Sequence, residues 1–176
     1  ISVLPPKESN LISNENTIIG NTVLYGATAG KLFASGQAGE RFAVRNSGAH
    51  AVIEGCDSNG CEYMTGGFVT ILGKVGDNFA AGMTGGMAFI YDPFSQFDKY
   101  VNSETVIWQK PETKYWIDFL KKTLEEYFTE TSSAIAGKII NNFNHEINNF
   151  QQVCPIEMLQ KLKNPISLKT TIKKVI

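Results

Sequence analysis

The side chains that could bind a metal or act as nucleophiles in this chain are three cysteines and two histidines. Cys56 and Cys61 are separated by four residues, whereas Cys154 lies far along the chain. Two thiols without a histidine close by fall short of the four ligands of a structural zinc site. A sparse, odd set of cysteines is typical of free thiols in a reducing compartment. We therefore expect no metal site and a cytoplasmic protein.

The candidates for acid–base chemistry and anion binding are also few. His50 lies between two alanines without a nucleophile motif, so we interpret it as a surface or corner histidine. Glu40-Arg41 and Arg45 could clamp an anionic ligand, but we favour a surface or corner ion pair. We expect Glu54 and Glu62 at corners, where their charges stay solvated. The sequence has no Gly-x-Ser-x-Gly elbow, phosphate-binding Gly-x4-Gly-Lys or zinc-type histidine cluster. We predict no catalytic, cofactor-binding or metal-binding residue.

Glycine spacing indicates the elements that hold these residues. Fifteen of the 16 glycines lie between Gly20 and Asp92, and they recur with a period near 19. Gly48, Gly67 and Gly86 show this spacing. A fixed period of this length is typical of repeat architectures. Two sets of strand-like runs lie between the glycines: Thr22–Tyr25, Arg41–Val44, Glu62–Thr65 and Phe79–Ala81, and Lys31–Ser35, Ala51–Glu54, Phe68–Leu72 and Met87–Tyr91.

These repeats predict a mainly β fold, a right-handed parallel β-helix of four stacked rungs with C-terminal α-helices. A unit this short encloses a core only when it stacks on the next one. Ile53, Ile71 and Phe89 are 18 residues apart and should stack inside the coil. An ordinary glycine-rich sandwich is the alternative, but Asn59-Gly60 is the single hairpin dipeptide of the Asn-Gly or Asp-Gly kind.

From Pro111 the apolar period becomes helical, and we expect Pro111 in the first turn. One stripe contains Trp116, Leu120, Leu124, Tyr127 and Phe128, and a second helix starts at Thr131-Ser-Ser133. We expect both helices to cap the far end of the coil. Aromatic residues in 93–110 should cover the last rung, Phe150–Cys154 should be extended, and Pro155–Lys163 could form a third helix.

The expected organisation is a β-helix domain at 1–110 with repeats at 20–92, a helical cap at 111–163 and a basic tail at 164–176. The lysines after Glu157 could form a nucleic-acid patch, but we favour a solvated or partner-docking tail: Lys161, Lys163, Lys169, Lys173 and Lys174. A formal charge of −1 argues against nucleic-acid and membrane-surface partners. The apolar stretches are too short for a membrane span.

Four segments also carry a resemblance: Gly20–Gly30, Ala38–Gly48, Gly60–Gly67 and Asn78–Gly86. They resemble the C-terminal GXGXG-repeat domain of the glutamate synthase large (alpha) subunit, a right-handed β-helix. The resemblance implies glutamate biosynthesis and ammonia assimilation by an oxidoreductase whose FMN, iron–sulfur cluster and glutamine hydrolysis belong to other domains. It therefore implies a structural or docking role for this chain, without catalytic residues or a cofactor of its own. Other domains or subunits of glutamate synthase are the implied partners.

Two alternatives remain open. The chain could be a β-helix subunit of another redox complex, of the formylmethanofuran dehydrogenase type, although the segments 38–48 and 60–67 favour glutamate synthase. It could also be a stand-alone β-helix enzyme, although it has neither a six-residue period nor clustered acids. Since the chain opens with Ile1, we expect its N-terminus to be missing or processed and its first rung to be uncovered near Leu4 and Val23. Such an end should associate with a second copy or with a partner domain.

Overall fold

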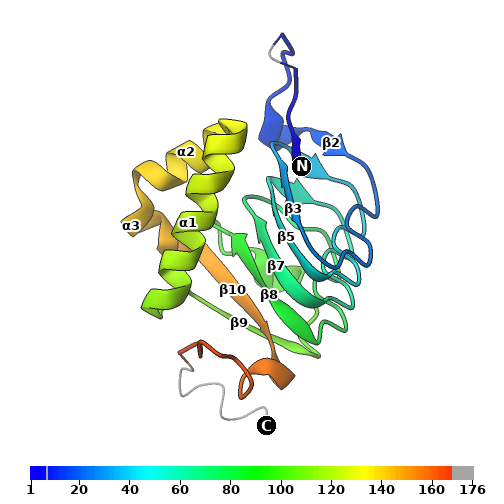
Figure 1. Cartoon of the computed structure of the whole chain (residues 1–176), viewed down its shortest axis with the longest axis vertical. Helices are drawn as coiled ribbons and strands as arrows, with labels where there is room; N and C mark the ends of the chain where they lie inside the picture. The colour runs from blue at the N-terminus through cyan, green and yellow to red at the C-terminus, as the bar shows by residue number, and fades with distance from the viewer. Residues whose placement is uncertain (7, 168–176) are drawn as a thin grey trace.

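The computed structural model describes residues 1–6 and 8–167 and forms a β-solenoid with helices along one side (Figure 1). The helices are α1 (Lys114–Thr131), α2 (Ala134–Asn141) and α3 (Phe143–Glu146). Single 3-10 turns occur at Ser13–Glu15, Phe97–Lys99, Ile147–Asn149 and Ile156–Met158. The strands are β1 (Ser2–Val3), β2 (Thr17–Ile19), β3 (Lys31–Ala34), β4 (Gln37–Ala38), β5 (Ser47–Ile53), β6 (Gly55–Cys56), β7 (Thr65–Ile71), β8 (Gly85–Tyr91), β9 (Val106–Gln109) and β10 (Phe150–Pro155).

The strands form two sheets on different sides of the coil. The larger sheet has the order β1-β3-β5-β7-β8-β10-β9, and its strands pair in parallel from β1 to β8. The smaller sheet, β2-β4-β6, is also parallel. The pairing of each strand with its equivalent one repeat later confirms the predicted parallel solenoid. A sandwich built from hairpins would pair neighbouring strands antiparallel.

The third side of the coil differs from the prediction. The runs Thr22–Tyr25, Arg41–Val44, Glu62–Thr65 and Phe79–Ala81 were expected to be strands, which is wrong. Every second residue in this region has φ between 53° and 64°, in three columns: Thr22, Arg41, Asn59 and Asn78; Leu24, Ala43, Cys61 and Ala80; and Gly26, Arg45, Tyr63 and Gly82. We call the segments 22–26, 41–45, 59–63 and 78–82 the turn ridge.

Backbone hydrogen bonds between successive coils hold the turn ridge together. Arg41 N donates to Ser58 O, Cys61 N donates to Phe42 O, and Arg45 N donates to Glu62 O, at 2.8–2.9 Å. The same pattern joins the other neighbouring segments of the ridge. Left-handed backbone costs a non-glycine residue roughly 1–2 kcal/mol. These hydrogen bonds, together with the burial of Ala43, Cys61 and Ala80 in the middle column, must offset that cost.

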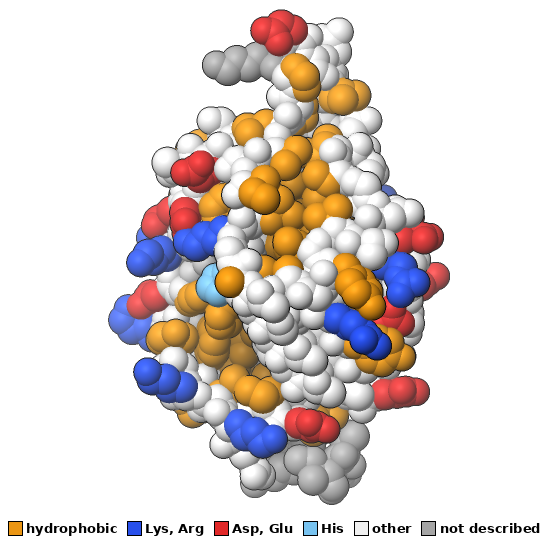
Figure 2. Space-filling view, turned by 45° about the vertical axis from the view of Figure 1, so that its right-hand side comes forward, with side chains coloured by type: hydrophobic (Ala, Val, Ile, Leu, Met, Phe, Trp, Pro, Cys, Tyr) orange, Lys and Arg blue, Asp and Glu red, His pale blue; other side chains and the backbone are white. Residues whose placement is uncertain are grey.

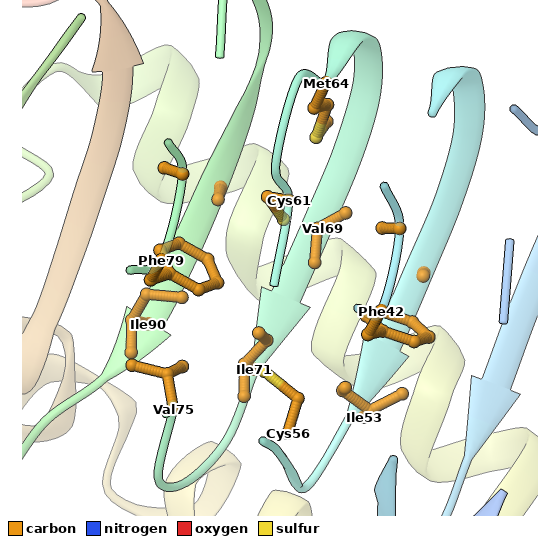
Figure 3. Close-up of a cluster of buried hydrophobic side chains, with 14 of the residues drawn as sticks. Phe42, Ile53, Cys56, Cys61, Met64, Val69, Ile71, Val75, Phe79 and Ile90 are labelled. Atoms are coloured by element: carbon orange, nitrogen blue, oxygen red, sulfur yellow. The ribbon is translucent and has the colours of Figure 1, made fainter. Parts of the chain in front are cut away.

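The interior columns differ from the predicted register by one residue. Ile53 pairs with Ile71 as expected, but Ile71 pairs with Ile90, and Phe89 pairs with Thr70. Ile53, Ile71 and Ile90 point into the coil together (Figure 3). Because successive side chains of a strand point to opposite faces, this shift moves Phe89 to the outer face. The prediction that Phe89 stacks inside the coil is therefore wrong.

A column of glycines sets how closely the coils approach. A Cβ on Gly48, Gly66 or Gly85 would lie 2.1, 2.2 or 2.0 Å from the carbonyl oxygen of Thr28, Ser47 or Thr65 in the preceding coil. Since real Cβ atoms do not approach that closely, each of these positions requires glycine. The glycine period in the sequence therefore reflects close backbone contact between coils at these three residues.

The helices cover the outer face of the larger sheet, not its end (Figure 1). Trp116, Leu120 and Leu124 of α1 pack with Phe33 and Phe89 of the sheet in one buried cluster. The expectation that the helices cap the far end is therefore wrong. That end is covered by β10 and β9, which continue the sheet antiparallel, and by the loop that carries Phe97.

The C-terminal part of the chain follows the sequence predictions only in part. Phe150–Cys154 is extended as expected, and β10 lies within the range 111–163 that was assigned to the helical cap. Ser133 caps α2, as the Thr/Ser start predicted. The helix α1 begins at Lys114, so Pro111 precedes the helix and is not in its first turn. Phe128 of the predicted stripe is 41% exposed. The stretch 155–163 contains a 3-10 turn in place of a third helix.

The predicted basic tail lies mostly outside the described residues, which end at 167. Within the described part of the chain, no helix is both long enough and apolar enough to cross a membrane.

Candidate docking surfaces and a buried carboxylate

The cysteines are core side chains in this fold. Cys56 and Cys61 are buried in the solenoid interior, and Cys154 is buried under the helices. Burial raises the pKa of Cys56 and of Cys154 to about 12, and it also raises the pKa of Cys61. Thiols in such surroundings remain protonated and inert. The described residues contain no group of three or more His, Cys, Asp or Glu side chains placed to hold a metal ion.

His50 lies within β5, so its expected corner position is wrong, although the side chain is still partly exposed between the sheet and α1. Its ring packs edge-on against Phe68, with 4.8 Å between centroids, and also faces Phe119 of α1. Burial lowers the pKa of His50, Lys31 lowers it further, and Glu126 opposes both. The arrangement makes His50 part of an aromatic contact between sheet and helix.

Glu54 lies at the corner between β5 and β6, as expected. The expectation that its charge stays solvated is wrong, because Glu54 is only 2% exposed. Its Oε1 accepts hydrogen bonds from the hydroxyls of Ser35 (3.2 Å), Tyr127 (3.0 Å) and Ser133 (2.5 Å). Its Oε2 is enclosed and has no hydrogen-bond partner among the described residues. Burial, followed by the charge of Glu54, raises the pKa of Tyr127. This buried carboxyl joins α1 and the start of α2 to the solenoid.

No local feature of the sequence indicates this cluster. Tyr127 and Ser133 lie 73 and 79 residues from Glu54 along the chain. The one available signal is that Glu54 directly follows the apolar run Ala51–Ile53, which places it at the end of a buried strand.

A hollow of about 770 Å³ lies beside Glu54, between the solenoid corner and α2. Lys74 and Lys138 line it and are exposed.

Arg41 and Arg45 project from the outer columns of the turn ridge and are exposed. The favoured interpretation as a surface or corner ion pair is wrong. Within residues 1–6 and 8–167, neither guanidinium group has a hydrogen-bond or ion-pair partner. Glu40 and Glu62 adjoin them in the chain without pairing with them. The ridge therefore presents two free guanidinium groups on a hydrogen-bonded backbone.

The first coil carries the other candidate docking surface. Val3, Ile18, Ile19, Val23 and Leu24 pack against the interior core but are only partly buried. Figure 2 shows a broad hydrophobic patch on this side of the molecule, below the N-terminal segment. We call these five residues the N-terminal end surface. Among residues 1–6 and 8–167, β1 is the outermost strand of the larger sheet and pairs only with β3. An open edge of this kind is a template for a further strand.

Comparison with known proteins gives consistent matches over nearly the whole chain. The family model described as "GXGXG motif" matches residues 1–156. The chain is 59% identical over 172 residues to the glutamate synthase [NADPH] large chain of Azospirillum brasilense, covering 98% of this chain and 11% of that protein. It is 44% identical over 173 residues to the glutamate synthase [NADH] of Schizosaccharomyces pombe, covering 98% of this chain and 8% of that protein.

A third relative is named as ferredoxin-dependent. The chain is 48% identical over 155 residues to the ferredoxin-dependent glutamate synthase of Pyropia yezoensis, covering 88% of this chain and 10% of that protein. The chain thus spans about a tenth of the length of the curated relatives it matches.

Proposed function

The chain belongs to the GXGXG motif family, and from this premise we propose that it is the solenoid domain of a glutamate synthase-type protein, a scaffold on which other parts of that protein dock. In this proposal the chain contributes to glutamate synthesis by positioning its neighbours and supplies no catalytic residue itself. The observation that carries the proposal is a pair of surfaces without a partner among the described residues: the partly buried apolar N-terminal end surface and the exposed arginines of the turn ridge. The interior of the solenoid between them is filled with apolar side chains.

The names of the relatives support a role that is independent of the electron donor. Those names specify NADPH, NADH and ferredoxin in turn, yet all three proteins match this chain at 44–59% identity. A domain that selected the donor would be expected to differ most among them. A common scaffold is the simpler role for a segment shared by all three.

The positions of the thiols support the view that an iron–sulfur cluster belongs elsewhere. Such clusters are held by several cysteine thiolates at one site. Here Cys56 and Cys61 lie in one core and Cys154 in the other, and burial raises the pKa of each thiol. These residues do not fit a cluster. In this proposal the flavin is likewise held by other parts of the protein.

The N-terminal end surface is the principal docking surface in this proposal. In the isolated chain it pairs with a second copy, which covers the apolar side chains and the open edge of β1. In the complete polypeptide another part of the glutamate synthase-type protein covers it. Both occupants would bury the same five residues.

The absence of a cofactor is tested with the purified chain. Its absorbance between 350 and 600 nm and its iron and zinc content are measured against protein concentration. The scaffold role predicts a colourless protein with far less than one equivalent of metal. Stoichiometric flavin or a full equivalent of iron would overturn it.

A further inference from the structure

We propose that Tyr25, Arg41, Arg45 and Tyr63 form a second docking surface, which binds a carboxylate-bearing surface from another part of the same glutamate synthase-type polypeptide. This inference rests on the proposed scaffold role. Beyond that role, it specifies which face of the solenoid docks and that carboxylates of the partner bind the two guanidinium groups. We call these four residues the Tyr–Arg surface.

The use of arginine on this ridge points to an interface. The sequence contains only two arginines, Arg41 and Arg45. Apart from the histidines, all its other basic side chains are lysines. A lysine would solubilise an exposed position equally well. Arginine differs because its planar guanidinium group binds a carboxylate through two parallel hydrogen bonds. Both arginines lack such a partner within the described residues.

The backbone beneath the arginines gives a second argument. Arg41 and Arg45 have φ of 60° and 55°, a conformation that glycine adopts with less strain. The equivalent of Arg45 in the first and last coils is indeed glycine, Gly26 and Gly82. Neither arginine side chain is buried, so core packing does not account for these side chains.

Two tyrosines complete the surface, each 53% exposed. The ring of Tyr63 lies over Gly82, where an added Cβ would be 2.5 Å from two ring atoms. The ring thus rests directly on the next coil while about half of the residue stays exposed. Tyrosine and arginine are, with tryptophan, the side chains enriched at energetically dominant interface positions. Tyr63 occupies the position equivalent to Arg45 in the next coil, and an aromatic ring next to a free guanidinium group suits a protein partner more than a small anion.

Charge complementarity identifies the occupant. Glu40 and Glu62 adjoin the arginines without pairing with them within the described residues, so both guanidinium groups remain available to carboxylates of a partner. Nucleic acid would require a broader basic surface. Two carboxylates spaced to meet Arg41 and Arg45 would satisfy both groups, and the tyrosine rings would cover apolar parts of the partner.

Site-specific photo-cross-linking in the complete polypeptide that carries this sequence tests the surface. A benzophenone amino acid replaces Tyr63 and, in a matched control, Tyr115 of α1, which is 47% exposed. A third variant carries the probe at Ile18 in the N-terminal end surface. Mass spectrometry of the cross-linked peptides identifies what each probe touches.

We expect the probe at position 63 to capture an Asp- or Glu-containing peptide from outside residues 1–176, and the probe at 115 to capture none. Capture at 18 but not at 63 would overturn the Tyr–Arg surface while leaving the scaffold role intact. Capture at neither position would overturn both. Cross-links from position 63 to a second copy of residues 1–176 would also overturn the proposed occupant.

Charge reversal then tests the part played by the guanidinium groups. Arg41→Glu combined with Arg45→Glu should lower cross-linking from position 63 at least about tenfold, because like charges face each other. The matched control, Lys110→Glu with Lys161→Glu, reverses two exposed lysines elsewhere and should leave the yield unchanged. A reversed-arginine variant that keeps its circular dichroism spectrum and its full cross-linking yield would overturn the proposal.

Discussion

Removing one hydroxyl from the Glu54 cluster should measurably loosen the attachment of the helices to the solenoid. Tyr127→Phe deletes the hydroxyl that lies 3.0 Å from both Glu54 Oε1 and Ala34 O. The ring itself, 5.7 Å from that of Phe33, keeps its packing. The free energy of unfolding should therefore fall by the value of one buried hydrogen bond to a carboxyl group, about 1.5–3 kcal/mol.

Urea unfolding followed by circular dichroism measures this change, with the midpoint and the slope fitted separately. Tyr115→Phe is the control, because its side chain is exposed and a surface change should stay within about 0.5 kcal/mol. Ser133→Ala should cost more than Tyr127→Phe, since Ser133 also caps α2 by accepting from Ala136 N. A loss below about 0.5 kcal/mol for Tyr127→Phe would refute the role of this hydroxyl as an anchor.

Three further outcomes follow from the fold. Phe89→Ala should cost about 3–5 kcal/mol in a urea titration and should alter the fluorescence of Trp116, whose ring lies 6.2 Å away; an unchanged spectrum would contradict its outward position. Gly85→Ala should cost more than about 2 kcal/mol, whereas Gly20→Ala, with nothing within 4 Å of the added Cβ, should be nearly neutral; equal effects would refute the close-approach argument. Stability should fall as pH rises from 9 towards 12, because the folded-state pKa of Cys56 is about 12 against an ordinary 9.0 and the unfolded chain loses that proton first. Cys56→Ala should reduce this dependence, and a flat profile in the unsubstituted chain would contradict the burial of the thiol.

The glycine period was sufficient to predict the solenoid, because it reflects a constraint that repeats in every coil. At Gly48, Gly66 and Gly85 a side chain would collide with the coil before it. The long apolar stripe of α1 was equally readable, since it requires a buried face. The stripe does not specify which surface covers that face, and the helices pack on the sheet and not at its end.

Other features could not be read from local pattern. The turn ridge looked like strands because ten of its twelve left-handed positions are not glycine, and its hydrogen bonds join residues about 19 apart. The register of β8 was ambiguous because Met87–Tyr91 is apolar on both faces, so alternation cannot choose between Phe89 and Ile90. Glu54 was misassigned because its partners lie on helices far along the chain.

Sedimentation velocity of the isolated chain tests the docking role most directly, together with amide exchange at the N-terminal end surface. The account predicts a dimer at micromolar concentration and a monomer of 19.4 kDa for a folded Ile18→Asp variant. It also predicts that the amides of Leu4 and Val23 exchange more slowly in the dimer than in the variant. A clean monomer of the unsubstituted chain with slow exchange at Leu4 and Val23 would show that this end is already covered, and would contradict the account.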